Sequence, residues 1–465
     1  MPELIISLIS VILVVCGQGL IFKNFTSSEG IDHENFYDVF IYGIILLSFT
    51  SLLLNFFTPI NKLVGTIIFV VSLVYFIQYF VRCKSKKKVI FNILVISIIT
   101  FLLVAYSFVN RPDAGLYHLP YISLINENKI IFGVSNLHFR FGHISILQYL
   151  SAAFNNYLIP IEAISIPSAI FFSSFIIYLF KNFYKKISEN NYKTALVFFL
   201  FIVFSIYSFN RYSEYGNDTP SHILFAFFTL LLINQKELNR FFFARVCLIS
   251  VYLFSIKPFM FILSPIILYF FLRMKDKFKI LVDRKIIFSL LFLILWISKN
   301  LITSGCVIYP ISKTCLSNLS YVDIDKTKIE EYSGEAWSKD WIHYKEKKYN
   351  IQEFNKKLRW FPTWKGNHFK IIFEKFGPFI LFLFIMFFIL LLNKDKRGKA
   401  KEPLLRNKAI NNYIILTFLI FSCLIWFLKF PLYRYGSSFL ATSAIFIFYL
   451  FIKDFNFKLK SNFVS

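Results

Sequence analysis

Apolar segments about as long as a membrane-spanning helix recur along this chain, from its first residues to beyond residue 440. A hydrocarbon core about 30 Å thick requires roughly 20 apolar residues per helical span. Of all residues, 57% are hydrophobic, whereas soluble globular proteins contain about 45–50%. An aqueous fold of this length cannot cover that much apolar surface. The sequence therefore predicts an all-α protein, a polytopic transmembrane helical bundle.

Thirteen spans are predicted when the runs RCKSKKK, KNFYKK, RMKDKFKILVDRK and KDKRGKAKEPLLRNK are placed on the cytoplasmic face. The predicted spans are residues 4–22, 38–58, 63–81, 89–108, 161–180, 193–209, 220–234, 240–256, 258–272, 286–302, 371–392, 411–428 and 436–452. This count puts the N-terminus outside. The first segment has no basic stretch and no small-residue cleavage site, so we interpret it as a retained span. Residues 143–160 contain Asn155, Asn156 and Pro160, and we expect a juxtamembrane helix against the outer face.

The net charge of +25 is divided among short basic runs between apolar segments. Such a distribution is typical of topology determinants and of contacts with anionic membrane lipids. It gives no support to nucleic-acid binding.

Three regions are expected: residues 1–302, an N-terminal transmembrane region with a catalytic outer loop at 109–160; residues 303–370, an outer loop subdomain; and residues 371–465, a C-terminal transmembrane region.

Two cysteines, Cys306 and Cys315, lie in the segment SGCVIYPISKTC, which is expected outside the membrane. In an oxidising compartment they are close enough to form a disulfide that closes a short loop. The alternative is two free thiols. A zinc site is disfavoured because two Cys without a nearby His provide too few ligands.

The first outer loop contains the sequence DAGLYH. Asp113 can act as the N-cap or a first-turn residue of an amphipathic helix that continues to about Glu127. Tyr117 then lies one turn after Asp113 on the same face, and His118 lies beside it. The alternative is that Asp113 only caps the helix and that His118 is a packed or solvated histidine.

The same loop continues with NLHFRFGH, which supplies His138, Arg140 and His143. Positively charged side chains that donate hydrogen bonds are suited to binding a phosphate. A carboxylate that accepts a proton, placed near phosphate-binding groups, is the minimum equipment for moving a sugar from a lipid-phosphate carrier to a hydroxyl. An inverting transfer needs one base, whereas a retaining hydrolase needs two carboxylates that we cannot pair here.

A second outer turn, FNRYSEYGNDTPSH, contains Arg211, Glu214, Asp218 and His222. The turn can equally be an ordinary polar hairpin. Asp218 or Glu214 could hold a divalent cation or the acceptor sugar.

Further candidates lie at the ends of predicted spans. Lys299 and Arg434 can simply snorkel to the interface, but both are expected on the side of Asp113 and could reach a lipid phosphate. The candidate substrate contacts are therefore Glu127, His138, Arg140, His143, Arg211, Glu214, Asp218, Lys299, Tyr309 and Arg434.

The motifs DAGLYH, NLHFRFG, EYGNDTP, SGCVIYP and RYG occur in this order. Together with about a dozen spans and a long late outer loop, they resemble the GT-C class of membrane glycosyltransferases, within a group of bacterial multi-pass proteins associated with surface polysaccharides. The resemblance implies a polyprenyl-phosphate-linked sugar donor, an outward-facing site, and Asp113 in the position of the class's acidic residue. This chain has no paired DxD or ExD there, so the resemblance leaves the cofactor unknown and a divalent cation open.

The expected function is thus a glycosyltransferase at the outer face of a bacterial cytoplasmic membrane, which transfers sugar to a glycan or a lipid-linked acceptor. Asp113 is the expected base, with Tyr117 and His118 as its orienting neighbours. One alternative is an O-antigen or polysaccharide polymerase or ligase, which the sequence hardly separates from the transferase. Another is a lipid-linked glycan transporter, but we find neither the internal symmetry nor the paired mid-span ionisable residues that a transporter predicts.

Overall fold

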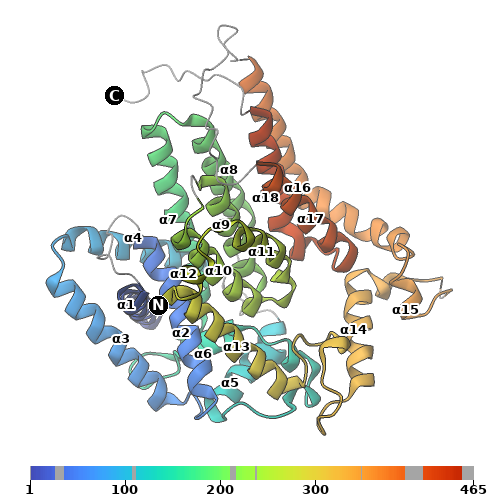
Figure 1. Cartoon of the computed structure of the whole chain (residues 1–465), viewed down its shortest axis with the longest axis horizontal. Helices are drawn as coiled ribbons and strands as arrows, with labels where there is room; N and C mark the ends of the chain where they lie inside the picture. The colour runs from blue at the N-terminus through green and yellow to red at the C-terminus, as the bar shows by residue number, and fades with distance from the viewer. Residues whose placement is uncertain are drawn as a thin grey trace. The chain divides into compact units, whose positions relative to one another are not determined.

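The computed structural model describes residues 2–26, 36–106, 112–209, 216–235, 238–346, 348–392 and 412–452. Within these ranges the chain is helical and contains no β-strand, which confirms the predicted all-α class (Figure 1). The N-terminal half contains α1 (Pro2–Thr26), α2 (Phe36–Asn55), α3 (Lys62–Arg82), α4 (Lys86–Tyr106), η2 (Ala114–His118), α5 (Leu119–Glu127), η3 (Val134–Asn136), η4 (Phe139–His143), α6 (Ile146–Ala152), η5 (Ile161–Ser165), α7 (Pro167–Ser188) and α8 (Tyr192–Ser208). There follow α9 (Asp218–Asn234), α10 (Arg240–Ile256), η6 (Pro258–Leu263), α11 (Ser264–Arg273), α12 (Lys277–Leu281), α13 (Arg284–Ser304), η7 (Ser312–Thr314), α14 (Ile324–Ser338), η8 (Trp341–His343), α15 (Ile351–Phe354), α16 (Phe361–Leu392), α17 (Asn412–Lys429) and α18 (Tyr433–Ile452).

Eight helices in the described part of the chain are long and apolar enough to cross a membrane: α1, α2, α3, α4, α13, α16, α17 and α18. They make the chain a multi-pass membrane protein by length and composition. The other five predicted spans fall on α7, on the 17-residue helices α8, α9 and α10, and on the run from η6 to α11. A helix of 17 residues is about 26 Å long, somewhat less than the thickness of a hydrocarbon core. The total of thirteen spans therefore stays a prediction.

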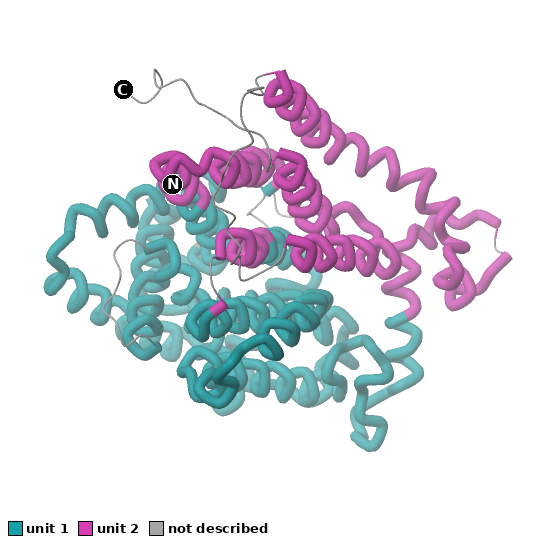
Figure 2. The backbone as a smooth tube through the Cα atoms, turned by 45° about the horizontal axis from the view of Figure 1, so that its top comes forward, with its two compact units in different colours: residues 1–178, 209–225, 239–331 teal, residues 179–208, 226–238, 332–465 magenta. Residues whose placement is uncertain are grey.

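The chain divides into two compact units, which Figure 2 colours separately. The first unit comprises residues 1–178, 209–225 and 239–331, and the second comprises 179–208, 226–238 and 332–465. These units do not follow the three regions expected from the sequence. The predicted outer subdomain is split, with residues 303–331 in the first unit and 332–370 in the second.

In the first unit, α1 packs against α2, α3 and α4. Close contact depends on glycines, because a Cβ at Gly17 would clash with the carbonyl oxygen of Ser72, and a Cβ at Gly19 with that of Val39. Hydrocarbon chains are as apolar as the helices, so association inside a bilayer depends on such close backbone packing. The small residues of α1 thus determine how tightly this bundle closes.

The turn between α2 and α3 is hydrogen-bonded to the first loop. The amide of Ile60 donates to the carbonyl oxygen of Ile125 at 2.9 Å, and the side-chain amide of Asn55 donates to the carbonyl oxygen of Asn128 at 2.9 Å. Helix α6 has only seven residues, all buried, and packs against α2 and α5. It is too short to cross a membrane. The region 143–160 thus contains a short helix buried inside the first unit, and its expected position against the outer membrane face stays a prediction.

The end of α13 brings the first loop and the cysteine segment together. The amide of Gly133 donates to the carbonyl oxygen of Ile302 at 2.9 Å, and the hydroxyl of Tyr321 donates to that of Leu301 at 2.8 Å. A disulfide joins Cys306 and Cys315, the pairing expected from the sequence. The cysteine loop is therefore closed covalently, and the hydrogen bonds hold the first loop against the same helix end.

The second unit contains a small aromatic subdomain, residues 332–372, next to α16, α17 and α18. Its buried core consists of Ala336, Phe354, Trp360 and Trp364. The indole nitrogen of Trp364 donates to the carbonyl oxygen of Pro431 at 2.7 Å, in the turn between α17 and α18. A compact aromatic core and this hydrogen bond fix the subdomain to the ends of the two last helices.

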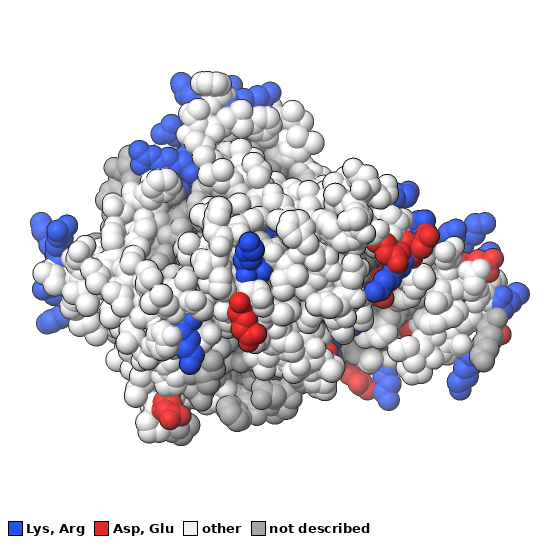
Figure 3. Space-filling view, turned by 90° about the horizontal axis from the view of Figure 1, so that it is seen from below, with Lys and Arg blue, Asp and Glu red and all other residues white. Residues whose placement is uncertain are grey.

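Charged side chains are unevenly distributed over the surface. On the face drawn in Figure 3 many of them lie near the outline and a few lie in the middle, and wide areas between them carry none. Helices α3 and α4 expose a series of large apolar side chains, among them Leu63, Ile67, Val70, Val74, Ile77, Phe91, Leu94, Ile98 and Leu102. Such a surface is typical of helices that contact lipid.

Candidate active site

The helix that carries the predicted catalytic residues begins with a π-helical turn at Ala114–His118 and continues as α5. In a π-helix the hydrogen bonds join residues five positions apart, and such turns occur frequently at functional sites. Asp113 therefore lies one wide turn before His118. Asp113 has helical dihedral angles, and its side chain makes no capping hydrogen bond. Of the two roles that the sequence left open, the structure thus has Asp113 as a first-turn residue and not as a cap.

Two side chains contact the imidazole of His118. The Nε2 atom of Gln148 lies 2.8 Å from Nδ1 of His118, and the ring of Tyr117 lies 4.3 Å from the imidazole between centroids. If the Gln148 amide donates to Nδ1, the neutral ring carries its proton on Nε2. The tautomer that fits this contact therefore presents an N–H donor on the other side of the ring.

The charge of His118 follows from its surroundings. Burial lowers its pKa to about 4, although the carboxylates of Asp113 and Asp218 act in the opposite direction and Arg140 lowers the pKa further. Burial disfavours the charged imidazolium because it removes the ring from water. His118 is therefore neutral at pH 7, and both carboxylates and the guanidinium lie near enough to influence it.

Arg140 stacks on aromatic rings at the edge of this group. Its guanidinium carbon lies 5.4 Å from the ring centroid of Tyr117 and 4.9 Å from that of Phe139. Among the described residues it has no ion-pair partner. A stacked guanidinium keeps the donors in its plane available for an oxyanion. Arg140 is thus well suited to bind a phosphate close to Tyr117.

The two histidines near Arg140 differ in role. Nδ1 of His138 accepts a hydrogen bond from the backbone amide of Arg140 at 3.2 Å, so His138 caps the short helix η4. His143 packs edge-on against Tyr309 with 5.2 Å between ring centroids. Burial, and then Arg140, lower the pKa of His143 to about 4, while burial and Glu330 raise the pKa of Tyr309 to about 12. His143 and Tyr309 are therefore a neutral pair that joins the first loop to the cysteine loop.

Asp218 is near His118 but has a partner. Its carboxylate forms an ion pair with Lys257, which follows α10. His222, on the same helix α9, is buried and stacks on Phe209. Two other candidates from this turn, Arg211 and Glu214, lie outside the described residues. The arrangement makes Asp218 a salt-bridged neighbour of the histidine.

Lys299 does not lie at an open span end, whereas Arg434 is exposed in the first turn of α18. Lys299 is fully buried, and its ammonium lies 3.9 Å from the ring centroid of Trp296 with no hydrogen-bond partner in the described chain. This burial disagrees with the expected snorkelling, because Trp296 and the packing of α13 enclose the ammonium. Arg434 belongs to the second unit, where its guanidinium contacts Trp337 and Tyr435.

Glu127 lies at the other end of α5, where one carboxylate oxygen accepts a hydrogen bond from Ser123 at 2.7 Å. Both residues line a cavity of about 640 Å³, whereas Asp113 and His118 do not.

Within the described ranges, no group of three or more His, Cys, Asp or Glu side chains is placed to hold a metal ion.

Sequence reasoning missed Gln148 and Lys257, which contact His118 and Asp218. Each is a polar residue inside an apolar stretch, in ILQYLS and LFSIKPF. A polar side chain in such a stretch needs a partner, and that signal could have identified both residues. Their partners come from distant parts of the chain, so the pairing itself is visible only in the structure.

A family model described as a domain of unknown function (DUF8201) matches residues 1–441, so the chain belongs to this family. No curated protein and no solved structure matches the chain.

Proposed function

We propose that this member of the DUF8201 family is a membrane glycosyltransferase that uses a polyprenyl-phosphate-linked sugar to assemble a cell-surface glycan. One observation carries the proposal: Asp113 and Arg140 both lie near enough to His118 at a π-helical turn to influence its charge, and His118 and Arg140 both contact the ring of Tyr117. A carboxylate, a neutral imidazole and a guanidinium beside one another provide a base, an orienting group and a phosphate contact. The acceptor is a glycan or a lipid-linked glycan.

The reaction assigns one role to each of these side chains. Asp113 takes the proton from an acceptor hydroxyl while the hydroxyl oxygen bonds to the anomeric carbon of the donor sugar. The bond from that carbon to the phosphate oxygen breaks with its electron pair, and the leaving phosphate carries the negative charge to Arg140. Attack opposite the leaving group inverts the anomeric carbon. A neutral His118 orients the acceptor hydroxyl and adds no positive charge that would weaken Asp113 as a base.

The basic runs support a proposal for the location and orientation of the protein. We place the run at residues 82–88, between α3 and α4, in the cytoplasm of a bacterium, and the loop with Asp113 on the outer face of the cytoplasmic membrane. The opposite ends of α3 and α4 are adjacent to residues 60 and 112, which agrees with this placement. Fusions of a reporter enzyme at residues 84 and 128 test it, since they should report opposite sides.

The direct test is transfer by the purified full-length chain in lipid nanodiscs. Polyprenyl-phosphate sugars of different headgroups are supplied with membrane glycolipid extracted from the source cells. Release of polyprenyl phosphate together with an equal amount of glycosylated acceptor supports the proposal. Transport of the intact lipid-linked sugar across the bilayer, without cleavage of its phosphate bond, would instead identify a transporter.

A further inference from the structure

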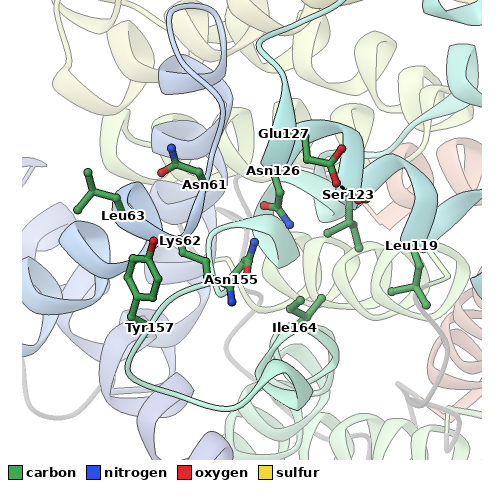
Figure 4. Close-up of a pocket in the computed structure, with 11 residues that line it drawn as sticks. Asn61, Lys62, Leu63, Leu119, Ser123, Asn126, Glu127, Asn155, Tyr157 and Ile164 are labelled. Carbon is green, nitrogen blue, oxygen red and sulfur yellow. Dashed lines mark hydrogen bonds between the residues drawn. The ribbon is translucent and has the colours of Figure 1, made fainter.

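The cavity of about 640 Å³ beside α5 lies within the first unit and is separate from the group around His118. Its walls are the turn between α2 and α3, one face of α5, and the turn after α6. Figure 4 shows the side chains of Asn126 and Asn155 directed into the space between these segments. Pockets that bind small ligands commonly have volumes of about 300–1,000 Å³. The cavity is therefore large enough for an organic ligand.

The polar lining consists mostly of uncharged hydrogen-bonding groups. Asn126 and Asn155 provide amides and Ser123 a hydroxyl. The Oδ1 atom of Asn126 is buried and has no hydrogen-bond partner among the described residues. Such a buried acceptor normally has a partner, because leaving it unsatisfied costs about 1–3 kcal/mol. The amides of Asn126 and Asn155 together offer both donors and acceptors to a ligand in the cavity.

The charged groups of the lining balance each other. Lys62 and Glu127 are its one cation and one anion. The ammonium of Lys62 lies 5.8 Å from the ring centroid of Tyr157, and one oxygen of Glu127 is bonded to Ser123. A phosphate would need an excess of cations, and an amine an excess of carboxylates. The matching ligand is therefore uncharged and rich in groups that both donate and accept hydrogen bonds.

Apolar side chains form the edge of the cavity. Tyr157 is 69% exposed, Leu63 is 59% exposed and Leu119 is 39% exposed. Figure 4 shows Leu63 and Tyr157 on one side and Leu119 on the other. An exposed aromatic ring next to amides and a carboxylate suits a sugar, which has an apolar C–H face and a rim of hydroxyl groups.

We propose that this cavity binds an uncharged saccharide, and that it is the subsite for the acceptor glycan. The acceptor role rests on the proposed transferase function, whereas saccharide binding does not. Leu119, which lines the cavity, directly follows His118 on the same helix. One continuous helix thus carries the proposed chemistry at its N-terminal end and the saccharide contacts along the rest of its length.

The test is saturation-transfer NMR and calorimetry on the full-length chain in nanodiscs. The probes are neutral oligosaccharides of glucose, galactose, mannose and N-acetylglucosamine, with glucose 1-phosphate as the charged probe. We expect at least one neutral oligosaccharide to bind. The variants Asn126→Ala and Tyr157→Ala should each raise its Kd at least tenfold. Asn128→Ala, an exposed amide just after α5 that does not line the cavity, is the matched control and should bind like the wild type.

Three results would overturn the subsite: no binding of any neutral probe, tighter binding of glucose 1-phosphate, or unchanged binding by both cavity variants. Asp113→Asn separates the two proposals, because it should abolish transfer and keep saccharide binding. If that variant transfers sugar normally, the role of Asp113 as the base fails; if the wild type transfers no sugar while saccharides still bind, the transferase function fails and the saccharide site remains. If transfer depends on Asp113 but the cavity binds no saccharide, only the subsite fails.

Discussion

The first loop, residues 112–143, lies outside the long apolar helices, and the aromatic subdomain, residues 332–372, includes only the first turns of one of them, α16; both regions are rich in aromatic side chains. Their charged groups are arranged differently. In the aromatic subdomain the ammonium of Lys339 is hydrogen-bonded to Glu335 and to the carbonyl oxygen of Asn355. The carboxylate of Asp340 is bonded to His343 and Asn367. These charges hold the subdomain together.

In the first loop, Asp113 and Arg140 have neither a hydrogen-bonded nor an ion-paired side-chain partner within the described residues. Both are partly exposed, and His118, which lies near enough to be influenced by both, is buried and neutral. Charged groups that stabilise a fold are normally paired with other protein groups, whereas charged groups that act on a ligand keep their hydrogen-bonding and ion-pairing atoms available for the ligand. The comparison therefore distinguishes a region built for packing from one that can bind and react.

The largest expected effect is the loss of activity in Asp113→Asn. The amide keeps the shape of the side chain but cannot accept the proton, so glycan formation should fall by about 10²–10⁴-fold. The measurement is surface-glycan formation in cells at matched protein levels. Asp340→Asn is the matched control in the aromatic subdomain, since Asn also tolerates its left-handed backbone (φ 71°). Equal activity of Asp113→Asn and Asp340→Asn would remove the distinction between the two regions.

In the aromatic subdomain the corresponding effect should be on stability. Glu335→Ala leaves the ammonium of Lys339, which is 2% exposed, without its carboxylate. Removing one partner of a buried pair typically costs about 3–5 kcal/mol. We expect a lower melting temperature and faster proteolysis between residues 344 and 350, with transfer activity per folded molecule unchanged. Glu374→Ala breaks an exposed pair with Lys370 and should melt like the wild type.

The pH dependence of stability tests the neutral histidines of the first loop. The pKa of His118 is about 4 in the folded chain, compared with about 6.5 in the unfolded chain. Between these values the unfolded state binds the proton first, so the free energy of unfolding falls as the pH falls, by up to about 3 kcal/mol. Above pH 6.5 the titration of His118 does not change the free energy of unfolding. Thermal unfolding in detergent from pH 7.5 to 4.5 should show this loss in the wild type.

His118→Gln should flatten part of that pH profile. His143 has a similarly low pKa, and His143→Gln should remove a further part. A profile that is unchanged in both variants would mean that these rings are not the neutral, buried groups described above.

The smallest expected effect concerns donor binding. Arg140→Ala removes a charge-assisted contact to the phosphate, which is typically worth about 1.5–3 kcal/mol, so KM for the donor should rise about tenfold or more. Arg359→Ala is the control, because Arg359 also stacks on a ring, that of Tyr349 at 4.4 Å, but in the aromatic subdomain. A donor KM that changes equally in both variants would contradict a phosphate site in the first loop.

Sequence periodicity and composition predicted the helical class because a bilayer imposes a simple requirement, about 20 apolar residues per span. The same reasoning located spans less well where helices are short. Helices α8, α9 and α10 have 17 residues each, and only their packing determines whether they cross. For residues 143–160 the sequence predicted a helix against the outer membrane face, but not that Ile146–Ala152 is fully buried because α2 and α5 cover it.

The sequence by itself determined that this chain has several segments long and apolar enough to cross a membrane, that its segments are helical, and that Asp113, Tyr117, His118 and Arg140 belong to one loop. These properties follow from local composition and short spacing. Only the tertiary structure decided that Asp113 lies one π-turn from His118, that Gln148 and Asp218 approach the same imidazole, and that Lys299 is buried. The approaches of Gln148 and Asp218 to His118 join residues far apart in the chain, and the burial of Lys299 depends on how whole helices pack, which no local pattern encodes.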